Sequence, residues 1–255
     1  MNDDYTIRMR YLALYFWEKE TVWIPCGQCP VGQLKLENVK HFEDRATRES
    51  YSSEDFDPEW ITGIFNGELK CSNCEETTVF NGLYRVDMTF GSDGRPAGYG
   101  DQLMIKNLLP SVPLIRFPRR CPKPIKDWLS DASSVIWSNP DLAANRIRTA
   151  IDGLLTLQNV NKTTINRQGK RVRLDTHSRI MLYAKSNSAV AKALEAVKWI
   201  GNNGSHEAGL SIGDVFDGLD LFSYSLNILY GDDSKAMQHL ASKIIARKGM
   251  VKTKK

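Results

Sequence analysis

Hydrophobic positions along the chain follow two different patterns. Up to about residue 120, short runs such as "TVWIPC" and "TTVFNGLYRVDMTF" carry the β-branched and aromatic residues that predict strands. Glycine- and proline-bearing stretches interrupt them, among them "FGSDGRPAGYG" and "LLPSVPLIRFPRRCPKP". The second stretch is typical of an extended linker. We therefore expect a β-rich domain over residues 1–110 and a proline-spaced linker over residues 111–122.

From Lys123 onward the apolar positions recur every three or four residues, which predicts helices. The first such stripe consists of Ile125, Trp128, Leu129, Ala132 and Ile136. Asn139 is an expected N-cap, Ser211 with Asp214 resembles a capping box, and Gly231 is an expected C-terminal stop. Further helices are expected around 180–184 and over 188–200, and a last one carries Met237, Leu240, Ala241 and Ile244. The fold class is thus α+β, with an all-α bundle over 123–249 and a basic tail over 250–255.

Composition narrows the class of protein only a little. The 255 residues are 42% hydrophobic, enough to bury the core of one large domain or two modest ones. The formal net charge of +4 permits a nucleic-acid partner without requiring one. No basic start followed by an apolar run marks a secretory signal, and no stretch reaches the ~18 apolar residues of a membrane span. We therefore expect a cytoplasmic protein with no membrane association. The cysteine count of five is odd, and that compartment argues against a disulfide framework.

Two C-x-x-C knuckles carry the strongest chemical signal. They are "CGQC", with Cys26 and Cys29, and "CSNC", with Cys71 and Cys74. Each knuckle brings two thiolates to one ion from a tight turn, and two knuckles form the closed tetrahedral site of structural zinc. A redox dithiol is the alternative for either knuckle alone. The knuckles therefore predict a zinc-ribbon-like site that holds Zn²⁺ for stability, with the segment from about Gln33 to Asn66 looping out, while Cys121 is an ordinary linker thiol.

Two segments concentrate the positive charge. Residues 167–173, "RQGKRVR", hold four basic residues and no acid, and the tail from Lys243 is basic as well. A solvated loop and a frayed tail explain both segments, and a phosphate-binding surface is the alternative. The candidate nucleic-acid-binding residues are Arg167, Lys170, Arg171 and Arg173. The polar residues that follow the first segment, Asp175, His177 and Arg179, are expected to cap a helix.

The order of elements in the second half resembles a known family. The helix "AANRIRTAIDGLL", an amphipathic helix that ends in "KWIGNNGSH" and the long helix "VFDGLDLFSYSLNILY" are similar to the prokaryotic domain-of-unknown-function family 4145, generally viewed as a branch of the HEPN-like helical domains. Members often carry paired knuckles and a proline-spaced linker ahead of the helices. The resemblance implies a HEPN-like bundle, a homodimer and a place beside restriction and other defence genes.

The same resemblance implies a candidate catalytic set. Active HEPN proteins are metal-independent ribonucleases in which an arginine precedes a histidine by a short spacing. His206 matches the histidine, which would move a proton, and Asn202 matches the polar residue after the arginine. Gly201 stands where the arginine would be, so Lys198 or Arg148 would have to stabilise the phosphate charge. Close helix packing at Gly201 and hydrogen bonding by Asn202 and His206 form the structural alternative.

Three hypotheses for the function follow. The first is a zinc-binding protein that recognises RNA, DNA or a protein partner, as a component of a prokaryotic anti-phage or mobile-element defence system. The second is a HEPN-type ribonuclease that uses His206. The third is a purely structural oligomerisation module, since the apolar stripe between Val215 and Leu229 serves a bundle core or a second copy equally well. The missing arginine favours a protein that is not an enzyme.

Overall fold

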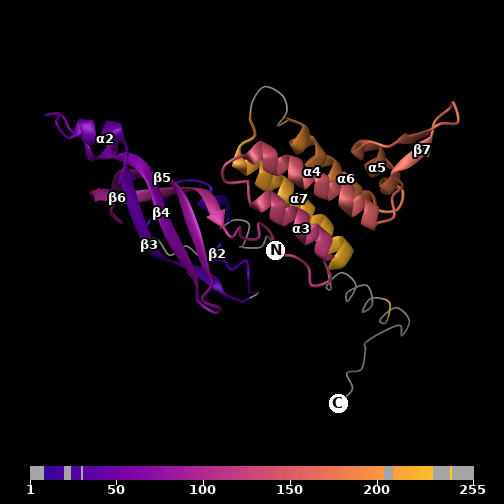
Figure 1. The fold of residues 1–255 in the computed structure, drawn as a ribbon, viewed down its shortest axis with the longest axis horizontal. Helices are drawn as coiled ribbons and strands as arrows, with labels where there is room; N and C mark the ends of the chain where they lie inside the picture. Colours follow the sequence, from indigo (N-terminus) through magenta and orange to yellow (C-terminus); the bar gives the residue numbers. More distant parts are fainter. Residues whose placement is uncertain (1–8, 20–23, 30, 204–208, 232–241, 243–255) are drawn as a thin grey trace, which may run out of the picture.

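The structure is a computed structural model and describes residues 9–19, 24–29, 31–203, 209–231 and 242. An antiparallel sheet occupies one end of an elongated molecule and a helical bundle occupies the other (Figure 1). The α+β class expected from the two hydrophobic patterns is therefore confirmed, with the β-rich region first and the helical region second. None of the helices within the described residues is long and apolar enough to cross a membrane.

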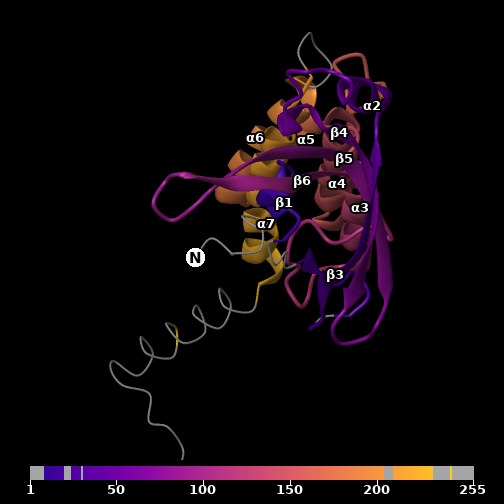
Figure 2. The same ribbon diagram turned by 90° about the vertical axis from the view of Figure 1, so that its left-hand side faces the viewer.

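The sheet has six strands in the order β1-β6-β5-β4-β3-β2. Four long strands form its body: β3 (Gln33–Glu43), β4 (Thr62–Cys71), β5 (Thr77–Phe90) and β6 (Pro96–Leu109). The short strands β1 (Phe16–Trp17) and β2 (Ile24–Pro25) pair with the outer edges of β6 and β3. The β5–β6 hairpin extends well beyond the sheet body (Figure 2).

Alternating burial explains why these residues form a sheet with one packed face. Along β4, Phe65, Gly67 and Leu69 are buried, while the residues between them are exposed. Phe65 packs at a tilt on Phe80 of β5, with ring centroids 4.9 Å apart. Gly82 allows the closest approach, because a Cβ there would lie 1.9 Å from the carbonyl oxygen of Met104 in β6. The pairing of β5 with β6 therefore depends on a glycine.

The expected looped-out insertion between the knuckles is wrong. Residues 33–66 contain β3, the short helix α2 (Arg45–Ser50), the 3₁₀ helix η1 (Pro58–Trp60) and the start of β4. The strands β3 and β4 pair from Leu34↔Cys71 to Glu43↔Gly63, with one register shift. About half of the residues of β3 are exposed, so the hydrophobic pattern of this segment is weak. It forms a strand because it pairs with β4, not because of its own sequence.

Among the described residues, five helices form the bundle: α3 (Lys123–Ser133), α4 (Pro140–Leu157), α5 (Thr176–Ala184), α6 (Ser188–Asn203) and α7 (Ile212–Tyr230). The helix α4 packs against each of the other four. Its N-cap is Asn139, whose side chain accepts from the N–H of Leu142, and α7 begins at a reciprocal capping box of Ser211 with Asp214. Both caps were predicted. The last expected helix, from Met237 to Ile244, lies outside the described residues, apart from position 242.

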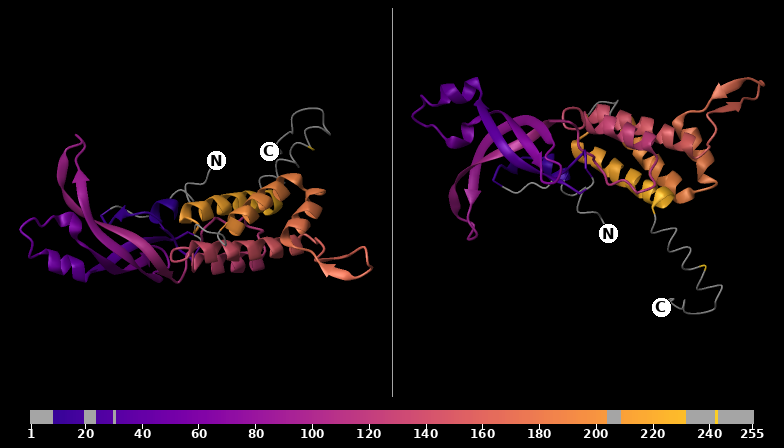
Figure 3. Two further views of the ribbon diagram at one scale, coloured as in Figure 1. Left: turned by 90° about the horizontal axis from the view of Figure 1, so that it is seen from above. Right: turned by 60° about the horizontal axis from the view of Figure 1, so that its bottom comes forward.

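The bundle is not all-α, because a two-stranded hairpin interrupts it. The strands β7 (Thr163–Ile165) and β8 (Arg171–Arg173) pair between α4 and α5, at the end of the molecule away from the sheet (Figure 3). Gly169 in their turn has a φ of 75°, a left-handed conformation that glycine adopts without strain. The basic segment that the sequence predicts as a loop is therefore this hairpin.

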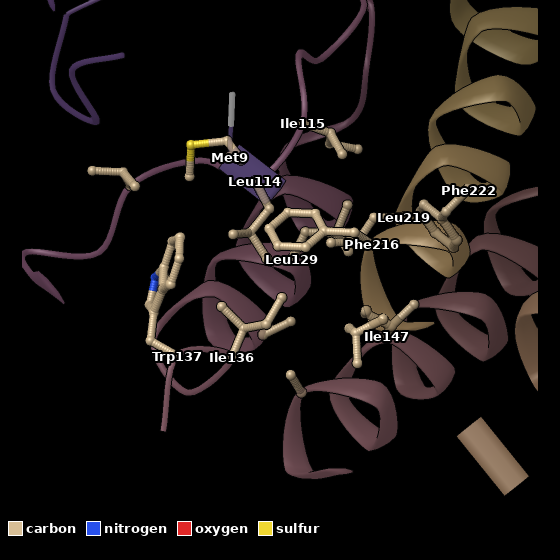
Figure 4. Close-up of a cluster of buried hydrophobic side chains, with 14 of the residues drawn as sticks. Met9, Leu114, Ile115, Leu129, Ile136, Trp137, Ile147, Phe216, Leu219 and Phe222 are labelled. Carbon is tan, nitrogen blue, oxygen red and sulfur yellow. The ribbon is translucent and has the colours of Figure 1, made fainter. Parts of the chain in front are cut away.

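A continuous hydrophobic core joins sheet and bundle. Met9, before the first strand, and Leu114, in the linker, are buried beside Leu129 of α3 and Phe216 of α7 (Figure 4). Next to Met9, the Arg10 guanidinium donates to Asp217 and Asp220 of α7, each at 2.7 Å. The chain therefore contributes buried residues to the bundle core twice, once before the strands of the sheet and once after them.

Candidate metal centre

The four knuckle cysteines come from two turns at the same end of the sheet. Cys26 and Cys29 follow β2, whereas Cys71 is the last residue of β4 and Cys74 lies in the turn to β5. The pair Leu34↔Cys71 in the β3–β4 ladder brings the second turn beside the first. Cys26 and Cys71 are buried, Cys29 is half-buried and Cys74 is exposed. The long separation in sequence is thus closed by strand pairing.

The sulfur atoms have the spacing of a tetrahedral thiolate site. All four Sγ atoms lie within 4.8 Å of one another. The distances from Cys26 to Cys74 and from Cys29 to Cys71 are both 3.7 Å. A disulfide requires about 2.05 Å, whereas zinc–sulfur bonds of ~2.3 Å at tetrahedral angles place thiolates ~3.8 Å apart. The residues therefore fit a metal ion bound by all four cysteines better than two dithiol pairs.

The space between the knuckles depends on Gly32. A Cβ at this position would lie 2.2 Å from Cys71 Sγ and 2.7 Å from Cys29 Sγ. Hydrogen bonds also point at the sulfur atoms: the N–H of Gln28 lies 3.3 Å from Cys26 Sγ, and the Asn73 side-chain amide lies 3.6 Å from Cys29 Sγ. Such donors stabilise thiolate charge around a metal. Neither Gly32 nor Asn73 stood out from the spacing of the cysteines alone.

Hydrogen bonding separates the acidities of the four thiols. The backbone N–H groups of Cys74 and Asn73 point at Cys71 Sγ and lower the pKa of the Cys71 thiol to about 6. At Cys74 the Glu76 N–H lowers the pKa, but the interaction with Cys71 and burial outweigh it and raise the pKa to about 12. A divalent ion displaces the remaining protons when it binds, so metal affinity in this site rises with pH.

The fifth cysteine has no part in this cluster. Cys121, in the linker, is buried, and burial raises the pKa of its thiol to about 11. A buried thiol of high pKa is a poor nucleophile and behaves as a small apolar side chain. This agrees with the interpretation of Cys121 as an ordinary linker thiol.

Three of the candidate catalytic residues lie in and after α6, and the fourth, Arg148, lies on α4. His206 and the side chain of Asn202 lie outside what the structure describes. The Lys198 ammonium lies 4.0 Å from the ring centre of its neighbour Trp199 and is close enough to Asp175 to contribute to the lowering of its pKa. Gly201 faces α4, where a Cβ would lie 3.4 Å from the Ala144 carbonyl and 3.8 Å from Arg148 Cβ. Close helix packing therefore accounts for Gly201, and the catalytic role of the set stays a prediction.

The candidate nucleic-acid-binding residues do come together. Arg167, Lys170, Arg171 and Arg173 are all exposed on the β7–β8 hairpin. Arg171 and Arg173 are two positions apart on β8, so they project from the same face of the strand. Lys162, directly before β7, adds a fifth exposed cation.

The expectation that Asp175, His177 and Arg179 act together as caps is wrong for Arg179. Asp175 does cap α5, with its carboxylate accepting from the N–H of Ser178 at 2.7 Å. Arg179 is instead only 3% exposed and forms an ion pair of 3.0 Å with Asp152 of α4. A charged residue is buried this deeply only when it is paired. No local pattern indicated this pair, because the partner lies on another helix.

Two family models match the chain. Residues 14–101 match the Domain of unknown function (DUF8608), and all four knuckle cysteines lie within this match. Residues 130–248 match the Domain of unknown function (DUF4145). The resemblance of the C-terminal helices to that family is therefore supported. Neither the curated proteins nor the solved structures yielded a match to this chain.

Proposed function

We propose that the protein is a zinc-stabilised nucleic-acid-binding protein, in which the four-cysteine site holds the end of the sheet together and the β7–β8 hairpin contacts phosphates. Four thiolates fill a tetrahedral coordination shell and leave no position for a substrate, so the ion has a structural role. Elemental analysis should find one zinc per chain. Replacement of Cys71 by Ser should abolish that zinc, and a folded sheet in a metal-free chain would contradict the role.

The observation that carries the binding proposal is the uncompensated charge of the hairpin. Five cations lie between Lys162 and Arg173, and no acidic residue lies in that segment. Among the residues that the structure describes, none of these five side chains has an ion-pair partner. Cations gathered on one projecting element favour phosphate contacts and counter-ion release. A two-stranded ribbon also fits into the major groove of B-DNA. Because DNA and RNA share the phosphate backbone, the proposal includes both.

The test is a salt titration of binding to random-sequence RNA and DNA, single- and double-stranded. The variant Arg167→Ala/Lys170→Ala/Arg171→Ala should bind more weakly, and the slope of log K against log salt should become shallower by ~0.7–0.9 for each phosphate that the variant no longer neutralises. A matched control, Lys35→Ala/Lys40→Ala/Lys192→Ala, removes the same charge from exposed positions elsewhere. It should retain the wild-type slope.

Two results would overturn the proposal. One is a wild-type protein that binds no nucleic acid even at low salt, which would leave a protein partner as the function of the hairpin. The other is equal weakening in the hairpin and control variants, because net charge alone would then explain binding. A defence-system partner and a homodimer stay predictions that rest on the family resemblance.

A further inference from the structure

A small recess lies at the root of the hairpin, between it and the helices α3, α4 and α5. Its volume is about 180 Å³, and its walls include Lys162, Arg173 and Arg179. Gly153 of α4 packs directly on the Trp128 ring of α3, where a Cβ would lie 2.1 Å from the ring. The recess therefore has a closely packed wall of helices and a rim formed by the two ends of the hairpin, and we refer to it as the Arg179 recess.

The buried guanidinium has one donor without an acceptor. Arg179 Nη1 donates to the Asp152 carbonyl and carboxylate, and Nη2 donates to Thr156 Oγ1 and the Val160 carbonyl, all at 2.9–3.1 Å. The Nε–H is buried and has no partner among the described residues. An unsatisfied buried donor on a charged group is costly, so such groups usually meet a water or a ligand. Since the four Nη donors are accepted within the protein and Nε is shielded from solvent, Arg179 contributes its charge to the recess wall rather than a free donor.

The charge of the walls favours an anion. Lys162 and Arg173 have no ion-pair partner within the described part of the chain. Asp152 is the one carboxylate in the wall, and it is already held by Arg179 and by the Thr176 hydroxyl at 2.9 Å. The hydroxyls of Thr149 and Thr156 donate to carbonyls of their own helix. Lys162 and Arg173 therefore supply the donors, and together with Arg179 their charge exceeds that of the single carboxylate.

We propose that the Arg179 recess binds the terminal phosphate of a nucleic-acid strand whose backbone follows the hairpin, an inference that rests on the proposed function. A phosphate monoester carries a charge of about −1.5 to −2 and three acceptor oxygens, which suits the two unpaired cations Lys162 and Arg173 better than an internal diester does. Arg173 belongs both to the hairpin and to the recess wall. The strand end and the strand backbone would thus be bound by adjoining parts of one surface.

The test compares one oligonucleotide in three forms, with a 5′ phosphate, a 3′ phosphate or two hydroxyl ends. Wild-type protein should bind one phosphorylated form about tenfold more tightly than the hydroxyl form, the effect expected of one further charge-assisted hydrogen bond. Lys162→Ala should remove most of this preference and change the affinity for the hydroxyl form much less. Lys192→Ala, an exposed lysine on α6, should leave the preference unchanged.

The outcomes separate this inference from the proposed function. Equal binding of all three forms would overturn the phosphate assignment and leave binding by the hairpin intact. If the protein binds none of the three forms, both the phosphate assignment and nucleic-acid binding by the hairpin are overturned. Inorganic phosphate and a phosphorylated peptide serve as further probes. Tight binding of either one, with no preference between the oligonucleotides, would overturn the assignment to a strand end.

Discussion

Gly32 occupies a position where the metal centre leaves no room for a side chain. A Cβ would overlap both Cys71 Sγ and Cys29 Sγ, which belong to different knuckles. We predict that Gly32→Ala pushes the two knuckles apart and lowers the zinc affinity by at least about tenfold, since the four thiolates must converge on one ion. Competition with a chromophoric chelator measures this affinity directly.

A suitable control is Gly213→Ala, in the first turn of α7. A Cβ there meets only Ser211 Oγ at 3.5 Å, an ordinary contact far from the cysteines in sequence. This variant should retain wild-type zinc affinity. Unchanged affinity in Gly32→Ala would mean that the four sulfur atoms do not hold the ion together.

Single residues differ in how far the sequence reveals their role. The four cysteines could be predicted because each knuckle is a local pattern of four residues and its chemistry is specific. Arg179 could not, because its acceptors Asp152, Thr156 and Val160 lie 27, 23 and 19 positions away. Gly32 was likewise hidden, since its closest clash partner, Cys71, becomes a neighbour only when β3 pairs with β4.

The helix α5 depends on its N-cap more than the longer helices do, because it has only nine residues. The Asp175 carboxylate accepts from the Ser178 N–H, and this hydrogen bond lowers the pKa of Asp175. We predict that Asp175→Ala lowers the free energy of unfolding by about 1 kcal/mol at pH 7. Urea denaturation, followed by circular dichroism, provides the measurement.

The sign of the pH dependence follows from the lowered pKa. The carboxylate contributes its full stabilisation above the unfolded-state value of about 3.9 and loses it as the pH falls through the folded-state value. The cost of Asp175→Ala should therefore be constant from pH 7 to about pH 5 and shrink below about pH 4. Asp55→Ala, at an exposed loop carboxylate, should cost almost nothing at any of these pH values. A cost of Asp175→Ala that persists unchanged in acid would show that the charge does not contribute.

At the scale of elements, the sequence predicted helices better than strands. The stripes of α4 and α7 and their caps follow from local spacing, and both helices appear where they were expected. The strand β5 was predicted, but β3, β4 and the β7–β8 hairpin were not. Their hydrophobic pattern is weak or absent: all six residues of β7 and β8 are exposed. Strand pairing is non-local, so a short polar strand leaves little trace in its own sequence.

Over the whole molecule, the domain boundaries expected at residues 110 and 123 stay predictions, yet the core extends across them. Leu114 and Ile115 of the linker and Met9 of the N-terminal segment belong to the same buried cluster as Phe216 and Leu219 of α7 (Figure 4). A chain divided into independent units would bury little apolar surface between them. The shared cluster instead implies that the sheet and the bundle stabilise one another.

The residue that tests this mutual stabilisation is Met9, because it precedes the sheet in sequence but is fully buried against the bundle. We predict that Met9→Ala lowers the free energy of unfolding by ~2–5 kcal/mol, the range for truncation of a buried methionine. Hydrogen exchange should become faster in α7, more than two hundred residues away in sequence. Leu14→Ala is the matched control, since Leu14 lies in the same segment but is 61% exposed and should change neither quantity. If Met9→Ala accelerates exchange only near residue 9, the N-terminal segment is a local addition and the bundle is stable without it. Faster exchange in α7 would mean that the Met9 side chain stabilises the bundle as well as its own segment.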